Sequence, residues 1–171
     1  MIETHGGALS VAADLGASKL LAEHGLALGE QWYPLHQVVA ILNRVGREIG
    51  EDALFRIGAS TFDYVALPAS VDSICKALRS LDVAYHMNHR KNGEPMFANG
   101  RCSEGIGCYV CTDETPGHFV IDSASLYPCS FDRGLVTAIA RQFEPRCDVW
   151  HLEGARCRRL GSLTCAYVIT W

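Results

Sequence analysis

The chain has 171 residues, of which 49% are hydrophobic and 20% charged, and its formal net charge at pH 7 is −4. This length fits one domain, and the hydrophobic content is sufficient for a core. No block of Lys and Arg is present, which argues against nucleic acid or an anionic membrane as the main partner. The N-terminal stretch lacks the basic start and apolar centre of a signal peptide, and no apolar run reaches the length of a membrane span. We therefore expect a cytoplasmic protein.

The first half of the chain has the patterns of helices. Residues 8–28 are rich in Ala and Leu, and residues 33–49 place their apolar side chains on one helical face. A shorter helix is expected over 50–61, after a Gly stop. Pro68 is expected to begin a further helix that ends near Leu81.

The hydrophobic period changes after this helix. Residues 83–89 alternate as a strand does, and the sequence KNGEP that follows is typical of a turn. The remaining expected elements are a strand over 118–124, a helix over 131–143, and strands over 147–154 and 164–171. This order predicts an α+β fold with an antiparallel sheet and an N-terminal helical layer. We divide the chain into an N-terminal helical extension, 1–30, and a main domain, 31–171.

The chain contains eight cysteines, which in a reducing compartment do not indicate a disulfide framework. Cys129 precedes the expected helix, Cys147 opens the next strand, and Cys157 and Cys165 flank a tight turn. Tetrahedral zinc takes four such ligands, and thiolate is a preferred donor. The alternative is a set of buried structural thiols, because Cys is among the most buried residue types.

Two stretches in the C-terminal half, YPCSFDRGLVTAIARQF and HLEGARCRRLGSLTCAYVITW, resemble the 4-vinyl reductase domain. This small-molecule-binding module is related to haem-nitric-oxide-binding and Golgi transport-particle folds. Glu153, Cys157, Gly161, Cys165 and Tyr167 match the pattern with which the family ends. The upstream VGREIGEDALFRIGAS resembles the entry helices of the family.

The resemblance implies a sensory domain in which zinc lies beside an effector pocket. Its zinc ligands map onto Cys129, Cys157 and Cys165, together with a Glu three residues before the first terminal Cys. This chain has Gly154 at that position, so the fourth ligand stays open. The candidates for it are Cys147, Glu153 and His151. We favour Cys147, because thiolate suits zinc.

A second group of cysteines lies in the sequence CSEGIGCYVC. Cys108 and Cys111 form a C-x-x-C pair, and Cys102 lies nearby. These three thiols are an alternative metal or redox site, and an iron–sulfur cluster would make the protein a redox or gas sensor. No helix pattern follows the pair, which argues against a thioredoxin-type motif.

His86 and His89 are the candidates for contact with a ligand. On the expected strand they point to opposite faces, so they are not expected to bind one metal as a pair. We expect one of them to face a ligand pocket that Tyr85 and Phe119 also line. The alternative is that neither contacts a ligand, with one histidine on the surface and the other in the core.

None of the motifs G-x-S-x-G, P-loop, G-x-G-x-x-G or H-E-x-x-H is present, so the sequence favours a binding protein over an enzyme. We expect a domain that senses a small, mostly apolar ligand, carries a structural zinc, and signals through a homodimer or a partner. The helix over 33–49 and the Ala/Leu-rich segment before it are the expected dimer interface. One alternative is a haem or iron–sulfur gas or redox sensor, and another is an enzyme or assembly factor in tetrapyrrole metabolism.

Overall fold

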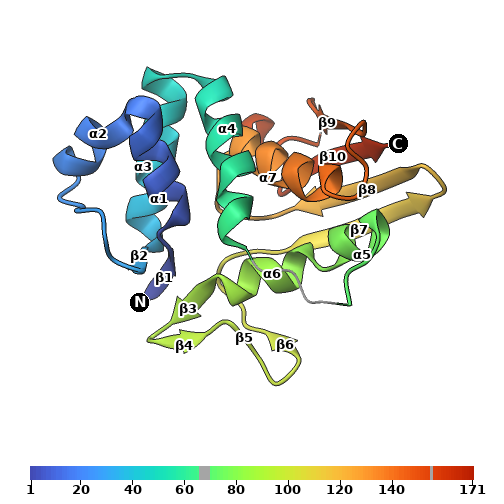
Figure 1. Cartoon of the computed structure of the whole chain (residues 1–171), viewed down its shortest axis with the longest axis horizontal. Coiled ribbons are helices and arrows are strands. Elements are labelled where there is room, and N and C mark those ends of the chain that lie inside the picture. Colours follow the sequence, from blue (N-terminus) through green and yellow to red (C-terminus); the bar gives the residue numbers. More distant parts are fainter. Residues whose placement is uncertain (66–69, 155) are drawn as a thin grey trace.

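The computed structural model describes residues 1–65, 70–154 and 156–171. The N-terminal part is mainly helical (Figure 1). Its elements in chain order are β1 (Ile2–His5), α1 (Gly7–Ala12), a π-helical turn (Ala13–Ala17), α2 (Ser18–Glu23), β2 (Trp32–Pro34), α3 (Leu35–Glu48), α4 (Glu51–Thr61) and a 3-10 turn (Phe62–Tyr64).

The rest of the chain contains most of the strands (Figure 1). Its elements are α5 (Ile74–Arg79), α6 (Leu81–Met87), β3 (His89–Lys91), β4 (Glu94–Pro95), β5 (Phe97–Ala98), β6 (Arg101–Cys102), β7 (Tyr109–Thr115), β8 (His118–Ser123), α7 (Cys129–Arg141), β9 (Asp148–Leu152), a 3-10 turn (Arg158–Leu160) and β10 (Cys165–Thr170).

The main sheet has the strand order β7-β8-β10-β9, and its neighbouring strands are antiparallel. Helix α7 lies between this sheet and α4 (Figure 1). Phe119 and Ile121 of β8 and Ile169 of β10 are buried in the core with Leu135 and Ile139 of α7. The arrangement confirms the expected α+β class with an antiparallel sheet.

A second sheet joins the N-terminus to the middle of the chain, with the order β2-β1-β3-β4. Strand β1 is central in it, so Thr4 pairs with Tyr33 on one side and with His89 on the other. The sequence patterns missed β1 and β2, which are too short for their period to show. The division of the chain at residue 30 stays a prediction.

Helices α4 and α7 cross with their backbones in near contact. A Cβ atom on Gly58 would lie 2.0 Å from the carbonyl oxygen of Phe131, and one on Gly134 would lie 2.1 Å from that of Phe55. Any larger residue would force the helices apart. The two glycines therefore bring the start of α7 close to the end of α4, where a cavity lies.

The strand expected over 83–89 is wrong, because α6 covers most of this segment. Leu81, Ala84 and Tyr85 are buried, and their spacing of three and four residues fits a helix as well as the alternation fits a strand. The expected helix over 8–28 is broken at Gly16, whose φ is 96°. The expected start at Pro68 lies outside the described residues.

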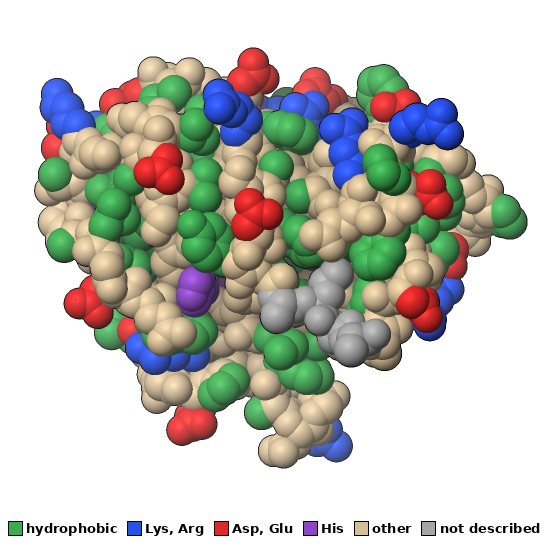
Figure 2. Space-filling model, in the orientation of Figure 1, with side chains coloured by type: hydrophobic (Ala, Val, Ile, Leu, Met, Phe, Trp, Pro, Cys, Tyr) green, Lys and Arg blue, Asp and Glu red, His purple; other side chains and the backbone are tan. Residues whose placement is uncertain are grey.

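The turn in KNGEP is confirmed. Asn92 and Gly93 have φ values of 54° and 87°, and they connect β3 to β4. Acidic, basic and apolar side chains are interspersed over the face shown in Figure 2. Among the described residues, no helix has the length and apolar character that crossing a membrane requires.

Candidate functional site

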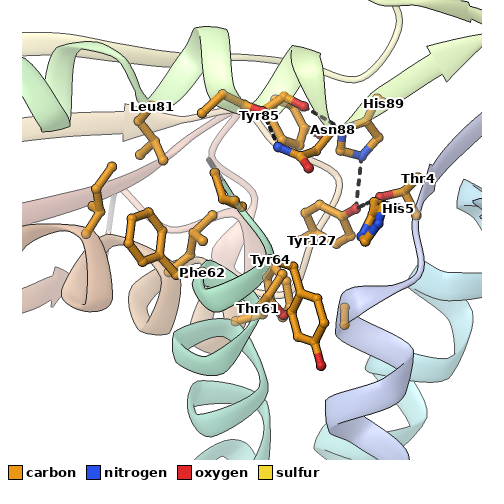
Figure 3. Close-up of a pocket in the computed structure, with 16 residues that line it drawn as sticks. Thr4, His5, Thr61, Phe62, Tyr64, Leu81, Tyr85, Asn88, His89 and Tyr127 are labelled. Atoms are coloured by element: carbon orange, nitrogen blue, oxygen red, sulfur yellow. Dashed lines mark hydrogen bonds between the residues drawn. The ribbon is translucent and has the colours of Figure 1, made fainter. Parts of the chain in front are cut away.

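A cavity of about 50 Å³ lies where β1, the end of α4, α6 and α7 meet (Figure 3). Its wall is mainly apolar. Phe62 and Leu81 lie on one side of it, and α7 contributes Phe131, Leu135 and Ile139. The polar groups on the wall are concentrated at one end, beside β1 and the end of α6 (Figure 3). An apolar cavity with a few convergent polar groups is the usual form of a small-molecule site.

The polar end of the cavity is a chain of hydrogen bonds. His89 Nδ1 lies 2.7 Å from the carbonyl oxygen of Tyr85, and His89 Nε2 lies 2.9 Å from the hydroxyl of Tyr127. The Tyr127 hydroxyl also lies 2.8 Å from that of Thr4. Because a carbonyl only accepts, Nδ1 carries the proton, Nε2 accepts from Tyr127, and Thr4 donates to Tyr127.

The imidazole of His89 is neutral. Burial lowers its pKa from 6.5 to about 4, while the hydrogen bond to Tyr85 opposes this shift and nearby His86 adds to it. Tyr85 packs edge-on against His89 with ring centroids 4.6 Å apart. The pKa of Tyr85 is raised far out of the physiological range by burial, and its hydroxyl donates to the carbonyl of Ile106.

Asp132 is the buried polar centre beneath this site. Its carboxylate accepts hydrogen bonds from the hydroxyls of Tyr109, Ser123 and Ser125 at 2.7, 2.9 and 2.7 Å, and from Arg158 at 2.8 Å. Burial raises the pKa of Asp132, and Arg158 and the hydroxyl donors oppose that rise. The sequence suggests only a helix-capping role for an Asp at this position, since the donors come from distant segments.

Beside Arg158, three buried thiols gather with one histidine. The ligand atoms of Cys129, His151, Cys157 and Cys165 all lie within 4.8 Å of one another, and the sulfurs of Cys129 and Cys165 are 3.2 Å apart. His151 Nε2 is buried and has no hydrogen-bond partner in the described part of the chain. Three sulfurs and one unpaired imidazole nitrogen are the donor set of a tetrahedral Cys₃His zinc site.

The charges around this cluster favour a thiolate. The backbone N–H and the Nε of Arg158 each lie 3.4 Å from the Cys165 sulfur. The Cys129 thiol and then Arg158 lower the pKa of Cys165, against the effect of burial. A deprotonated thiol is the form that binds a metal.

The structure places the other candidates for the fourth ligand away from this cluster. Cys147 is buried in the main apolar core. Glu153 is exposed, and its carboxylate lies 3.7 Å from Arg159. His151 is therefore the residue that the fold groups with the three thiols, in place of the favoured Cys147.

The cysteines of the second group do not gather in one place among the described residues. Cys111 is exposed on β7, and its thiol points to the carbonyl of Asp113. Cys102 lies 3.5 Å from an Asp82 carboxylate oxygen. Cys102 and Cys108 both line a groove between α6 and the loop that connects β6 to β7. Burial and then Asp82 raise the pKa of Cys102 to about 11.

The residues expected to contact a ligand lie in three different parts of the structure. Tyr85 and His89 line the cavity, whereas His86 lines the groove on another side of α6. Phe119 is fully buried in the core and is not part of the cavity wall. Tyr127 and Thr4 complete the polar end, and no sequence signal pointed to them, because β1 reaches His89 only through sheet pairing.

Similar structures were found among solved H-NOX (haem NO/oxygen-binding) domains. The H-NOX protein of S. oneidensis in the Fe(II)NO state matches 96% of this chain and 97% of its own, with a TM-score of 0.62 and 15% identity. An H-NOX protein of K. algicida matches 97% and 95%, with a TM-score of 0.64 and 12% identity. An oxygen-binding H-NOX domain related to soluble guanylate cyclases matches 96% and 91%, with a TM-score of 0.59 and 14% identity.

The chain therefore has the H-NOX fold, which agrees with the expected relation to haem-nitric-oxide-binding folds. The assignment to the 4-vinyl reductase family is wrong, because the similar structures are H-NOX domains over nearly the whole chain. The resemblance to that family depended mainly on short C-terminal stretches. No family model matches the chain, and no curated protein matches it.

Proposed function

We propose that this chain is a small-molecule sensing domain of the H-NOX fold, and that its ligand occupies the cavity beside His89. The observation that carries the proposal is the apolar cavity closed at one end by neutral His89, Tyr127 and Thr4. A ligand there contacts β1, α6 and α7 together. Its binding would therefore change how the N-terminal elements sit against α7, which is a route to a partner or to a second copy of the chain.

Haem is the cofactor that the fold suggests, since structures of this fold have been studied for haem distortion. A histidine is a usual haem ligand, and His89 supplies a neutral imidazole. In the described conformation, however, Tyr127 occupies Nε2 of His89. The wall has neither Lys nor Arg among its described residues to bind the haem carboxylates.

The size of the cavity also argues against haem as its ligand in this conformation. Pockets for drug-sized ligands measure roughly 300–1,000 Å³, and haem is at least that large. The cavity of about 50 Å³ does not fit haem as it stands. An apolar ligand about the size of a xenon atom matches this volume, and such a ligand is our first candidate. A haem-based gas sensor is the second candidate, favoured by the fold and by the neutral state of His89.

Absorption spectroscopy and thermal unfolding separate the two candidates. We expect no shift of the hemin Soret band when the protein is added, and a higher Tm under xenon pressure. Ala84→Leu fills the cavity and should abolish the rise in Tm, whereas Leu163→Phe, at a side chain that is 91% exposed, should preserve it. A stoichiometric shift and sharpening of the Soret band that is lost in His89→Ala would establish the haem sensor instead. No response to either class of molecule would refute the sensing role of the cavity.

We also propose that Cys129, His151, Cys157 and Cys165 bind a structural zinc ion. The unpaired buried nitrogen of His151 supports this, because a buried polar atom without a partner is costly unless a ligand satisfies it. Four protein ligands leave no open position for water, so the role is structural. The zinc would hold the C-terminal segment against the start of α7.

The homodimer stays a prediction. The apolar face of α3, including Val38, Ile41 and Leu42, is buried within this chain. An interface between copies would therefore use other residues of α3, and light scattering at micromolar concentration tests it.

A further inference from the structure

A second group of metal-ligating side chains lies on the side of α6 away from the cavity. One ligand atom from each of Asp82, His86 and Cys102 lies within 4.8 Å of the other two. A groove of about 290 Å³ opens beside them, lined by the loop that connects β6 to β7. None of these residues belongs to the cavity or to the Cys129 cluster.

Helix α6 and strand β6 build this group from separate segments. Asp82 and His86 are four residues apart on α6, so they lie on the same face one turn apart. Cys102 ends β6. The loop after it packs closely, since a Cβ on Gly107 would lie 2.0 Å from the carbonyl oxygen of Ala124.

The side chains are held in place before any metal binds. The Oδ1 atom of Asp82 accepts a hydrogen bond of 2.9 Å from the backbone N–H of Tyr109, while Oδ2 lies 3.5 Å from the Cys102 sulfur. His86 is 3% exposed, and its Nδ1 lies 2.8 Å from the carbonyl oxygen of Asp82. The backbone contacts of Asp82 Oδ1 and His86 Nδ1 leave Asp82 Oδ2 and His86 Nε2 as the ligand atoms, and such outer contacts are the usual means of orienting metal ligands.

We propose that Asp82, His86 and Cys102 form a second metal site that takes a borderline divalent transition-metal ion, with Zn²⁺ as the representative. The mixture of oxygen, nitrogen and sulfur donors fits zinc, whereas calcium and magnesium prefer oxygen alone. Three protein ligands leave the fourth position open to water from the groove. The metal here exchanges with solvent more readily than one enclosed by Cys129, His151, Cys157 and Cys165.

Zinc titration of the chelator-treated full chain, against a competing chromophoric chelator, tests the site. We expect two equivalents for the unchanged protein and one for Cys102→Ser, whose side chain is exposed and whose fold should be intact. Asp82→Asn keeps the oxygen that Tyr109 binds but loses the charge, so the weaker affinity should fall tenfold or more. Cys111→Ser, an exposed thiol outside the group, is the matched control and should bind two equivalents.

The variants also separate the two metal proposals. Cys165→Ser should keep the equivalent that Cys102→Ser loses. If the unchanged protein binds one equivalent that Cys102→Ser removes and Cys165→Ser does not, this proposal stands and the structural zinc site fails. If Cys102→Ser and Asp82→Asn bind zinc with unchanged stoichiometry and affinity, the second site is refuted.

Discussion

Arg158 joins the buried carboxylate of Asp132 to the thiol of Cys165. One guanidinium nitrogen lies 2.8 Å from Asp132 Oδ2, and Nε lies 3.4 Å from the Cys165 sulfur. The same guanidinium donates to the carbonyl of Tyr127 at 2.9 Å. One side chain therefore connects the C-terminal segment to α7, to the proposed zinc ligands, and to a residue of the cavity wall.

The first prediction concerns Asp132. In Asp132→Asn the shape is retained, but the partly buried Arg158 loses its charged partner. Breaking a buried pair on one side costs about 3–5 kcal/mol, and we expect a loss of this size in the free energy of unfolding by urea. Asp122→Asn removes the ion pair with Arg156, which is near the surface, and should cost no more than about 1 kcal/mol. Equal costs for the two variants would contradict the central role of Asp132.

The second prediction concerns the structural zinc. Metal analysis of the purified chain should find one tightly bound zinc, and chelation should lower the Tm because metal binding contributes to folding. Cys165→Ser and His151→Ala should lose this zinc. Cys147→Ser, also at a buried cysteine, should retain it. Loss of zinc from the Cys147 variant, with retention in the His151 variant, would reverse our choice of the fourth ligand.

The third prediction concerns the contact between α4 and α7. In Gly134→Ala the new methyl group would lie 2.1 Å from the backbone oxygen of Phe55, so the helices must separate. Overpacking costs typically about 1–3 kcal/mol, and we expect at least that loss in urea unfolding. In Gly46→Ala the added atom meets the end of the Leu54 side chain, which can move, so the loss should be much smaller. Similar losses for both would argue against a rigid contact.

The fourth prediction concerns pH. The pKa of His89 is about 4 in the folded chain, against 6.5 as its ordinary value. The unfolded chain therefore takes up a proton first, and the stability that neutral His89 contributes is lost as the pH falls from about 6.5 to 4. The loss is about 3 kcal/mol at most, at 1.36 kcal/mol per pKa unit.

His89→Gln provides the comparison for this prediction. Carboxylates also titrate at the acid end, so the quantity to measure is the difference in unfolding free energy between the unchanged chain and His89→Gln across pH 7 to 4. We expect this difference to decline with falling pH. A difference that stays constant over that range would show that His89 titrates normally in the folded state.

The elements whose hydrophobic period is long and unambiguous can be predicted from the sequence alone. The stripes in 33–49 and 131–143 correspond to α3 and α7, and the alternation in 118–124 and 164–171 corresponds to β8 and β10. These patterns are local, so they can be read before any long-range contact is known. The prediction of a strand over 83–89 was wrong because the apolar spacing there fits both the helical and the strand period.

Which side chains meet depends on how distant segments of the chain pack together. Antiparallel pairing sets His151 opposite Tyr167, two residues from Cys165 and on the same face of the sheet. The same register sets Asp148 opposite Thr170, so the adjacent Cys147 lies beyond the far end of β10, about 20 Å along the strand from Cys165 at about 3.3 Å per residue. Likewise β1 brings Thr4 to His89, and α6 turns Asp82 and His86 toward Cys102. Residue types and spacing along the chain define the candidates, but strand register and helix phase, which depend on contacts between distant segments, select among them.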